Sequence, residues 1–280
     1  MYSRLPSFLG YIATSLILFI ASFSVGAEDI ARAIRTNSQA PGMVENYIEF
    51  GRKYQTGVKA SLGRIRDDYE FEDNFINGSL HWGDWFVERF GESNDPYLFG
   101  YAVHNDETWS IDLIFGVKYE DLIPRQGRLE GLGHRNSATL FGGRATGFFG
   151  DNIVQFSLRQ DISEKWSGHE AFALVGRNWQ VKNWNFHGMA GVKYFSSGII
   201  EYYYGISEEE SRRTGLDAYK PGSFFTYTVE LGVTYPLSEH LVFRATAKGR
   251  TYADEATDSP IFVNKRSTGY SMSTSLSLVF

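Results

Sequence analysis

The carboxyl-terminal segment alternates between bulky and small side chains. From Tyr270 to Phe280 the even positions carry Tyr, Met, Thr, Leu, Leu and Phe, whereas the odd positions from 271 to 277 are all Ser. In a β-strand this alternation produces one apolar face and one polar face. The closing strand of a bacterial outer-membrane barrel has such a pattern over roughly ten residues. The edge of a soluble β-sandwich has it too, so the segment favours a barrel without establishing one.

The amino terminus indicates export. Arg4 precedes an apolar run from Phe8 to Val25, and small residues follow before the first acidic pair. This order is typical of a secretory signal peptide, which we place at residues 1–27. The apolar run is also long enough for an uncleaved helical anchor, which stays as the alternative.

Composition excludes several classes of function. The chain has 27 Lys and Arg against 33 Asp and Glu, a net charge of −6, so we expect no nucleic-acid partner. The absence of cysteine excludes disulfides and thiolate chemistry. The chain is rich in aromatic residues, yet its mean hydropathy of −0.28 is polar. Aromatic belts at two membrane interfaces, around a polar lumen, would account for both properties.

Period-two alternation recurs through the chain and predicts an all-β, antiparallel transmembrane β-barrel of 12 strands, or of 10 if the early hairpins are misread. The predicted strands are 57–66, 73–82, 84–90, 96–103, 108–119, 138–149, 152–162, 168–181, 184–196, 224–238, 241–252 and 269–280. In this assignment short and long connections alternate. The longest are near 120–137, 197–223 and 253–268. Bacterial barrels have short periplasmic turns and longer extracellular loops, so this sorting supports the barrel in the outer membrane.

One segment of the domain plan stays open. Residues 28–56 do not fit the strand repeat, and we predict that they form a periplasmic arm or plug, with an extra strand from Tyr47 as a further alternative. Residues 57–280 are predicted to form the barrel. No linker or low-complexity tract suggests a second folded domain.

Several motifs in the last eighty residues resemble those of a known family. They are Tyr-Tyr-Tyr-Gly-Ile-Ser at 202–207, Thr-Gly-Leu at 214–216, Leu-Gly-Val-Thr-Tyr-Pro-Leu-Ser-Glu-His at 231–240 and Ala-Asp-Glu-Ala-Thr-Asp-Ser-Pro-Ile at 253–261. With the terminal strand, they resemble the MltA-interacting protein (MipA/OmpV) family of outer-membrane proteins. The resemblance extends over roughly residues 95 to 280.

The resemblance implies a scaffold that links peptidoglycan-remodelling enzymes, with a lytic transglycosylase and a peptidoglycan synthase as partners. Other members of the family are porin-like or adhesive. We therefore expect a non-enzymatic structural protein in contact with outer-membrane lipid and lipopolysaccharide. The alternative is a porin-like channel for small polar or anionic solutes.

Four charged residues are candidates for a lumen site. Arg244, Lys248 and Arg250 share one face of their predicted strand, and the hairpin near Ser238 brings Glu230 across from Lys248 or its neighbour. A cationic wall of this kind selects anions in a channel. The same residues form a neutralised polar core in a narrow barrel, and we favour that interpretation.

No catalytic, cofactor or metal site is predicted. The six His residues show no metal-ligand spacing. His169 and Glu170 are adjacent, but the chain has no nucleophile elbow or ordered triad to accompany them.

Overall fold

The computed structural model describes residues 46–56, 59–61, 64–66, 70–90, 97–118, 129–262 and 267–280. The predicted signal peptide and residues 28–45 lie outside this description. None of the described helices has the length and apolar character needed to cross a membrane.

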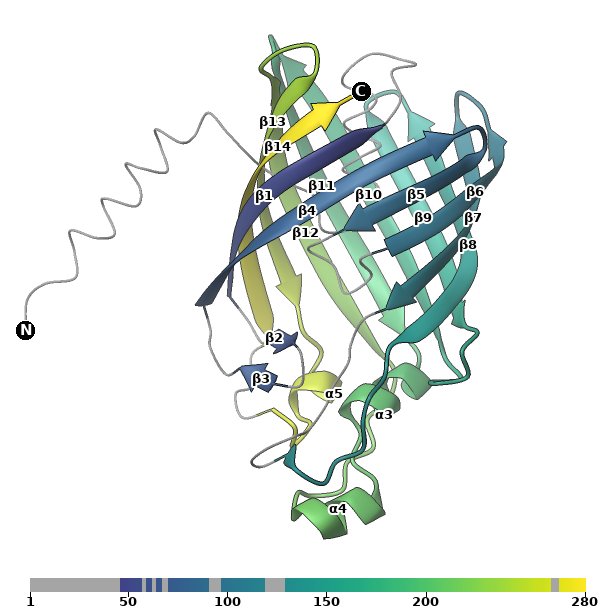
Figure 1. Cartoon of the computed structure of the whole chain (residues 1–280), viewed down its shortest axis with the longest axis vertical. Helices are drawn as coiled ribbons and strands as arrows, with labels where there is room; N and C mark the ends of the chain where they lie inside the picture. Colours follow the sequence, from purple (N-terminus) through teal and green to yellow (C-terminus); the bar gives the residue numbers. More distant parts are fainter. Residues whose placement is uncertain are drawn as a thin grey trace, which may run out of the picture.

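Twelve strands close into an antiparallel barrel (Figure 1), in the order β1-β14-β13-β12-β11-β10-β9-β8-β7-β6-β5-β4. This confirms the predicted fold class and strand number. The barrel strands are β1 (Tyr47–Thr56), β4 (Glu70–Trp82), β5 (Trp85–Phe90), β6 (Tyr97–Asn105), β7 (Trp109–Lys118), β8 (Ala138–Phe149), β9 (Asn152–Asp161), β10 (His169–Val181), β11 (Trp184–Phe195), β12 (Phe224–Pro236), β13 (Leu241–Thr251) and β14 (Thr268–Val279).

The first strand differs from its predicted position. Residues 57–66 were expected to open the barrel, but β1 starts at Tyr47 and pairs with both β14 and β4. The short strands β2 (Lys59–Ser61) and β3 (Arg64–Arg66) form a separate two-stranded sheet. The extra strand from Tyr47 is thus the alternative that the structure shows. One outward position of β1 is occupied by the charged Arg52. The segment therefore lacks the unbroken apolar alternation on which the strand prediction relied.

Connections at the two ends of the barrel differ in length. At one end the turns are tight, and Gly83 and Gly150 adopt φ values of 62° and 61°, which favour glycine. At the other end the connections contain the helices α3 (Ser197–Tyr204), α4 (Glu208–Thr214) and α5 (Asp254–Thr257). Both the short turns and the carboxyl terminus lie at the top of Figure 1, and the helices lie at the bottom. The lower end is therefore the extracellular end of an outer-membrane barrel.

The two faces of each strand have opposite character. On β14, Met272 is 65% exposed toward lipid, whereas the neighbouring Ser273 is 5% exposed and faces the lumen. Aromatic pairs lie at both ends of the outer wall, for example Trp184 with Tyr235 near a short turn and Tyr194 with Phe225 near a long loop. This distribution matches the two aromatic belts of a membrane barrel.

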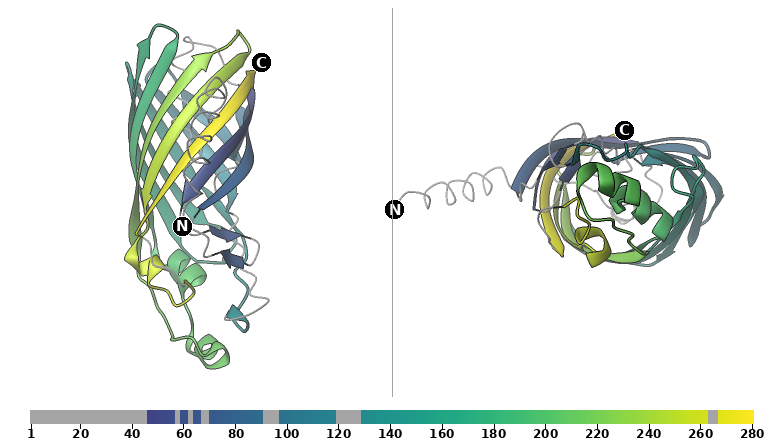
Figure 2. Two further views of the ribbon diagram at one scale, coloured as in Figure 1. Left: turned by 90° about the vertical axis from the view of Figure 1, so that its left-hand side faces the viewer. Right: turned by 90° about the horizontal axis from the view of Figure 1, so that it is seen from below.

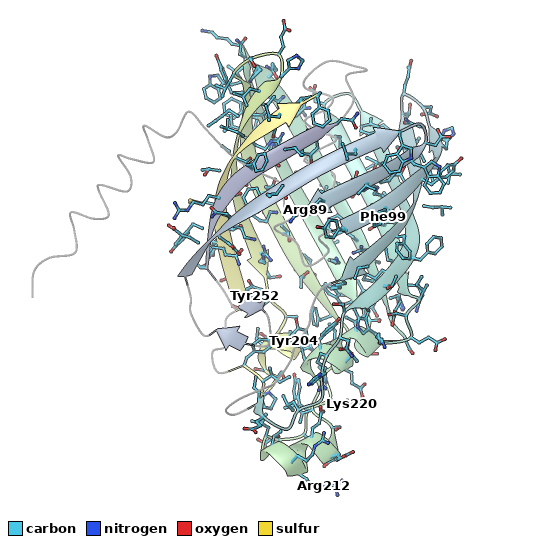
Figure 3. The ribbon with its side chains drawn as sticks, viewed as in Figure 1. Arg89, Phe99, Tyr204, Arg212, Lys220 and Tyr252 are labelled. Atoms are coloured by element: carbon cyan, nitrogen blue, oxygen red, sulfur yellow. The ribbon has the colours of Figure 1, made fainter. Side chains whose placement is uncertain are left out.

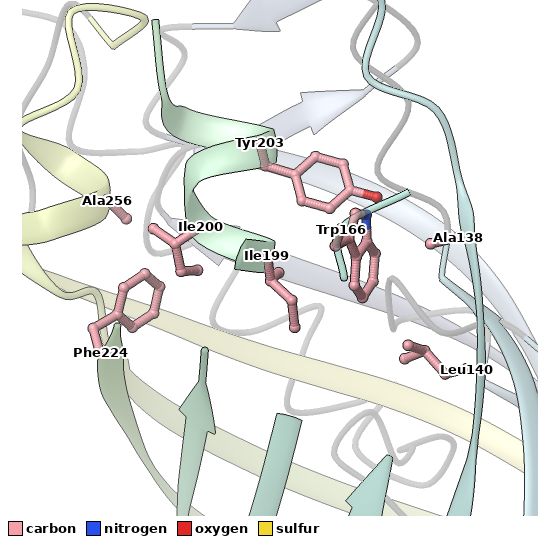
Figure 4. Close-up of a cluster of buried hydrophobic side chains, with 8 residues drawn as sticks. All are labelled: Ala138, Leu140, Trp166, Ile199, Ile200, Tyr203, Phe224 and Ala256. Carbon is pink, nitrogen blue, oxygen red and sulfur yellow. The ribbon is translucent and has the colours of Figure 1, made fainter. Parts of the chain in front are cut away.

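Helix α3 covers the extracellular mouth of the barrel, as the view from below in Figure 2 shows. Ile199, Ile200 and Tyr203 of α3 are buried. They belong to an apolar cluster with Ala138, Leu140, Trp166, Phe224 and Ala256 (Figure 4). Burial of each large apolar side chain is worth about 1.5–3 kcal/mol, so this cluster holds the helix against the strand ends.

Helix α4 projects beyond this cap, where Figure 3 labels Arg212 and Lys220 far from the strands. Ser207 and Glu210 form a capping box at its amino terminus. Glu210 also accepts a hydrogen bond from Arg135 at 2.8 Å. Burial tends to raise the pKa of Glu210, but hydrogen bonds from Arg135 and from the backbone of Ser207 and Gly133 outweigh it and lower the pKa to about 2.

Candidate functional site in the barrel lumen

The lumen contains most of the buried charge of the described chain. We define four lumen clusters by the carboxylates at their centres. The first contains both Glu88 and Asp112, and the other three are centred on Glu170, Glu49 and Glu230. The exposed fraction of each of these carboxylate residues is at most 4%. A buried charge is unfavourable unless it is paired, so the partners of these groups determine how the lumen is filled.

The first cluster links three strands in one part of the barrel. Arg144 on β8 binds Asp112 on β7 through Nε at 2.8 Å and Glu88 on β5 through Nη1 at 3.1 Å. Its guanidinium group also lies 5.1 Å from the centroid of the Phe86 ring, a cation-π arrangement. In the barrel order β8 and β5 are three strands apart. The long Arg144 side chain therefore binds both its neighbour on β7 and a residue two strands further on.

The second cluster lies near the extracellular end, because Lys118 is the last residue of β7 and Glu170 is near the start of β10. Lys118 Nζ is 3.0 Å and Lys193 Nζ is 3.2 Å from the Glu170 carboxylate, which Arg159 also contacts. These four residues come from β7, β9, β10 and β11. Three cations therefore share the Glu170 carboxylate, on the lumen side of the apolar cluster that α3 forms at the mouth of the barrel.

Apolar side chains fill the lumen beside these two clusters. Among the buried residues, one group comes from β5–β7 and the other from β9–β11. They are Phe86, Leu98 and Ile114, and Ile153, Phe172, Leu174 and Met189. Wide porins have a polar, water-filled interior. This side of the lumen is instead packed like a protein core.

Glu230 and Lys248, two of the residues singled out from the sequence, lie directly opposite each other in the β12–β13 register. Lys248 Nζ is 2.9 Å from Glu230 Oε2, and His187 Nε2 is 3.2 Å from Oε1. A Cβ atom at Gly232 would lie 2.2 Å from the His187 ring, so the missing side chain at that position makes room for the imidazole. His187 was not part of the sequence-derived set, although it shares the lumen parity of β11.

Arg244 and Arg250 have different surroundings. Arg244 Nη1 binds Glu49 on β1 at 2.9 Å, and Asn77 and Ser275 also donate hydrogen bonds to that carboxylate. Arg250 is half-buried and forms no ion pair with any residue that the structure describes. Of the four sequence-derived residues, three therefore take part in ion pairs and Arg250 does not pair within the described ranges.

Arg250 lines a small open-sided recess of about 10 Å³, room for about one water molecule, where β13, β14 and β1 face the lumen. Its walls carry two further cations and four neutral polar side chains. The lining residues are Lys53, Gln55, Thr246, Lys248, Arg250, Ser271 and Ser273. Three cations and several hydroxyl groups on one wall favour anions over cations.

Sequence reasoning missed the residues of the first two clusters. Asp112 and Lys118 alternate with the apolar residues 109–119 of their strand, but neither they nor Glu88, Arg144 and Glu170 belong to the set of lumen candidates. Strand parity could have placed each of them in the lumen, although it could not show which strands face each other. Across the described ranges, no group of three acidic or His residues is arranged to hold a metal ion.

Comparisons with known proteins agree with this architecture. The family model described as MltA-interacting protein MipA matches residues 43–280. The putative outer membrane protein YiaT of Escherichia coli (strain K12) is 34% identical over 108 residues, which cover 39% of this chain and 44% of that protein. The MltA-interacting protein of Escherichia coli (strain K12) is 39% identical over 79 residues, 28% of this chain and 32% of that protein. Each of these two matches thus spans less than half of the relative.

A longer match and one solved structure complete the comparison. Outer membrane protein Omp26La of Vibrio anguillarum is 23% identical over 233 residues, 78% of this chain and 86% of that protein. The NanC porin structure shares 8% identity with a TM-score of 0.46, covering 84% of this chain and all of that chain. The family match extends over the whole barrel and decides the identification. The chain belongs to the MltA-interacting protein (MipA) family and is an outer-membrane β-barrel.

Proposed function

We propose that this barrel is a non-enzymatic interaction protein with a closed lumen, and that it binds cell-wall enzymes on its periplasmic side. The observation that carries the proposal is the filling of the lumen by ion pairs between non-neighbouring strands and by apolar clusters. Arg144 joins β8 to β5, and Lys118 joins β7 to β10. Because each pair links strands that are three apart, the two bridges occupy space that a diffusion channel would leave to water.

The periplasmic end offers the binding surface. Tyr47 begins β1 at the end that carries the short turns, so the chain enters the barrel from that side. We propose that residues 28–45 contribute to this surface. One relative is named MltA-interacting protein, and the family resemblance implies a lytic transglycosylase as a partner. We propose an enzyme of this class as the first partner and a peptidoglycan synthase as the second.

Two measurements on the mature chain test the proposal. Planar-bilayer recordings should show no conductance step, and periplasmic pull-down should capture a lytic transglycosylase. Deletion of residues 28–45, which leaves β1 intact, should reduce that capture. A stable conductance step with no captured enzyme would contradict the proposal.

A narrow anion channel is the second candidate, and the recess beside Arg250 favours it. In that case the conductance should prefer anions, and Arg250→Glu should reduce or reverse the preference. Ser277→Ala on the same lumen face, outside the recess, is the matched control. If both variants conduct alike, the recess takes no part in permeation.

A further inference from the structure

A polar patch interrupts the lipid-facing wall where β1 lies between β4 and β14. Arg52 and Glu72 form an ion pair there, and their side chains are 64% and 51% exposed. Asn74 on β4 and Thr274 on β14 are the register partners of Arg52, and both are exposed. We call these four residues the polar patch.

The patch lies within the apolar band of the wall. Phe50 and Tyr54 precede and follow Arg52 on the same outward face, with exposed fractions of 52% and 39%. Met272, exposed by 65%, lies beside Tyr54 on β14. Charged residues that face lipid destabilise a barrel to a degree that depends on their depth. An ion pair in this position therefore suggests that something other than lipid covers it.

The composition of the patch restricts what that covering is. Arg52 alone would suit the phosphate groups of an anionic lipid, but Glu72 neutralises it within the same pair. A surface that carries one cation and one anion is complementary to itself. When two copies are related by a two-fold axis along the membrane normal, the same patch faces itself and Arg52 of each copy can meet Glu72 of the other.

We propose that the polar patch is the contact surface of a homodimer, in which a second copy of this chain covers the β1–β4 wall. This inference does not depend on whether the lumen conducts.

Cross-linking in native membranes gives the first test, since the natural chain has no cysteine. Thr274→Cys in the full chain should yield a disulfide-linked dimer on mild oxidation. Phe156→Cys, also lipid-facing and 54% exposed but on β9 across the barrel, is the matched control and should remain monomeric. Equal cross-linking at the two positions would show random collision and overturn the proposal.

Charge reversal in the Thr274→Cys background gives the second test. Arg52→Glu and Glu72→Arg should each reduce the dimer yield, by about tenfold if the intermolecular pairs are worth about 1.4 kcal/mol. When the two variant chains are produced together, the acidic patch of the first meets the basic patch of the second, and the yield should recover in the mixed dimer. Heat-dependent electrophoretic mobility verifies that each barrel is folded. Wild-type yields for the single variants, or a loss that mixing does not restore, would overturn the proposal.

Discussion

The two sides of the lumen are built from different side chains. Strands β5–β11 supply bulky apolar residues and long cations such as Arg144, whose ion pairs cross several strands. Strands β12–β14 and β1 supply Ser, Thr and shorter-range pairs, such as Lys248 with Glu230 on the adjacent strand. The first side fills the lumen, whereas the second leaves the small recess beside Arg250. We refer to them as the packed side and the recess side.

The difference shows that strand number alone does not make a channel. Twelve strands enclose a lumen that side chains can fill or leave open, and the choice depends on which residues occupy the inward positions. On the packed side, Arg144 and Lys118 each have one ion-pair partner on a strand three positions away. On the recess side, small hydroxyl groups occupy the same parity and leave free volume.

The largest expected effect is a loss of unfolding free energy, and it should differ between the packed side and the recess side. Arg144→Met removes the common cation of Glu88 and Asp112 and leaves two buried carboxylates together. Loss of one partner from a buried pair costs about 3–5 kcal/mol. Arg250→Met is the matched control on the recess side, where no ion pair within the described ranges is lost, and its effect should stay within about 0.5 kcal/mol. Urea unfolding in lipid vesicles measures both.

The comparison would be wrong if the two arginine variants unfolded at the same urea concentration. In that event the Arg144 cluster would contribute no more than a solvated surface pair. A further variant with Arg144→Met, Glu88→Gln and Asp112→Asn together should recover part of the lost stability, because it removes the uncompensated charge.

A smaller effect is expected within the recess side itself. Ser275 donates a hydrogen bond to the buried Glu49 carboxylate, whereas Ser271 lines the recess. Hydrogen bonds to charged groups contribute about 1.5–3 kcal/mol, so Ser275→Ala should lower the free energy of unfolding by an amount of this order. Ser271→Ala, on the same face of the same strand, should change it by less than about 0.5 kcal/mol. Equal losses of unfolding free energy would mean that the hydrogen bond from Ser275 to Glu49 contributes no more to stability than the contacts of Ser271 in the recess.

The sequence predicted much of the barrel because alternation is a local property. Eleven of the predicted strands agree with observed strands to within a few residues. The hairpin also indicated that Glu230 lies near Lys248, because adjacent strands share a short turn. It could not predict that Arg144 reaches Glu88, since strand parity carries no information about curvature or about which distant strands converge. The apolar cap was missed for the same reason, as Ile199 and Trp166 meet only after the barrel closes.

The smallest effect on barrel stability is expected for an ion pair outside the lumen. Arg135 and Glu210 form a similar pair in the extracellular loops, with side chains exposed by 10% and 9%. Glu210→Gln should leave urea unfolding of the barrel unchanged to within about 0.5 kcal/mol, but it should loosen α4 and speed tryptic cleavage after Arg212 and Arg213. Glu208→Gln on the exposed face of α4 is the matched control.

The pH dependence of proteolysis shows whether the ionised Glu210 carboxylate stabilises the loop. The pKa of Glu210 is lowered to about 2 in the folded loop, because the hydrogen bonds from Arg135 and the backbone outweigh the opposing effect of burial. Its unfolded value is about 4.3, so the carboxylate stabilises the loop fully above about pH 5 and loses this contribution as the pH falls toward about 2. An acid-active protease should therefore cut the loop faster below about pH 4 in the natural chain, whereas cleavage of Glu210→Gln should show no such step. If both chains showed the same acid step, another group would hold α4. In that case the comparison between lumen and loop pairs would need a different loop residue.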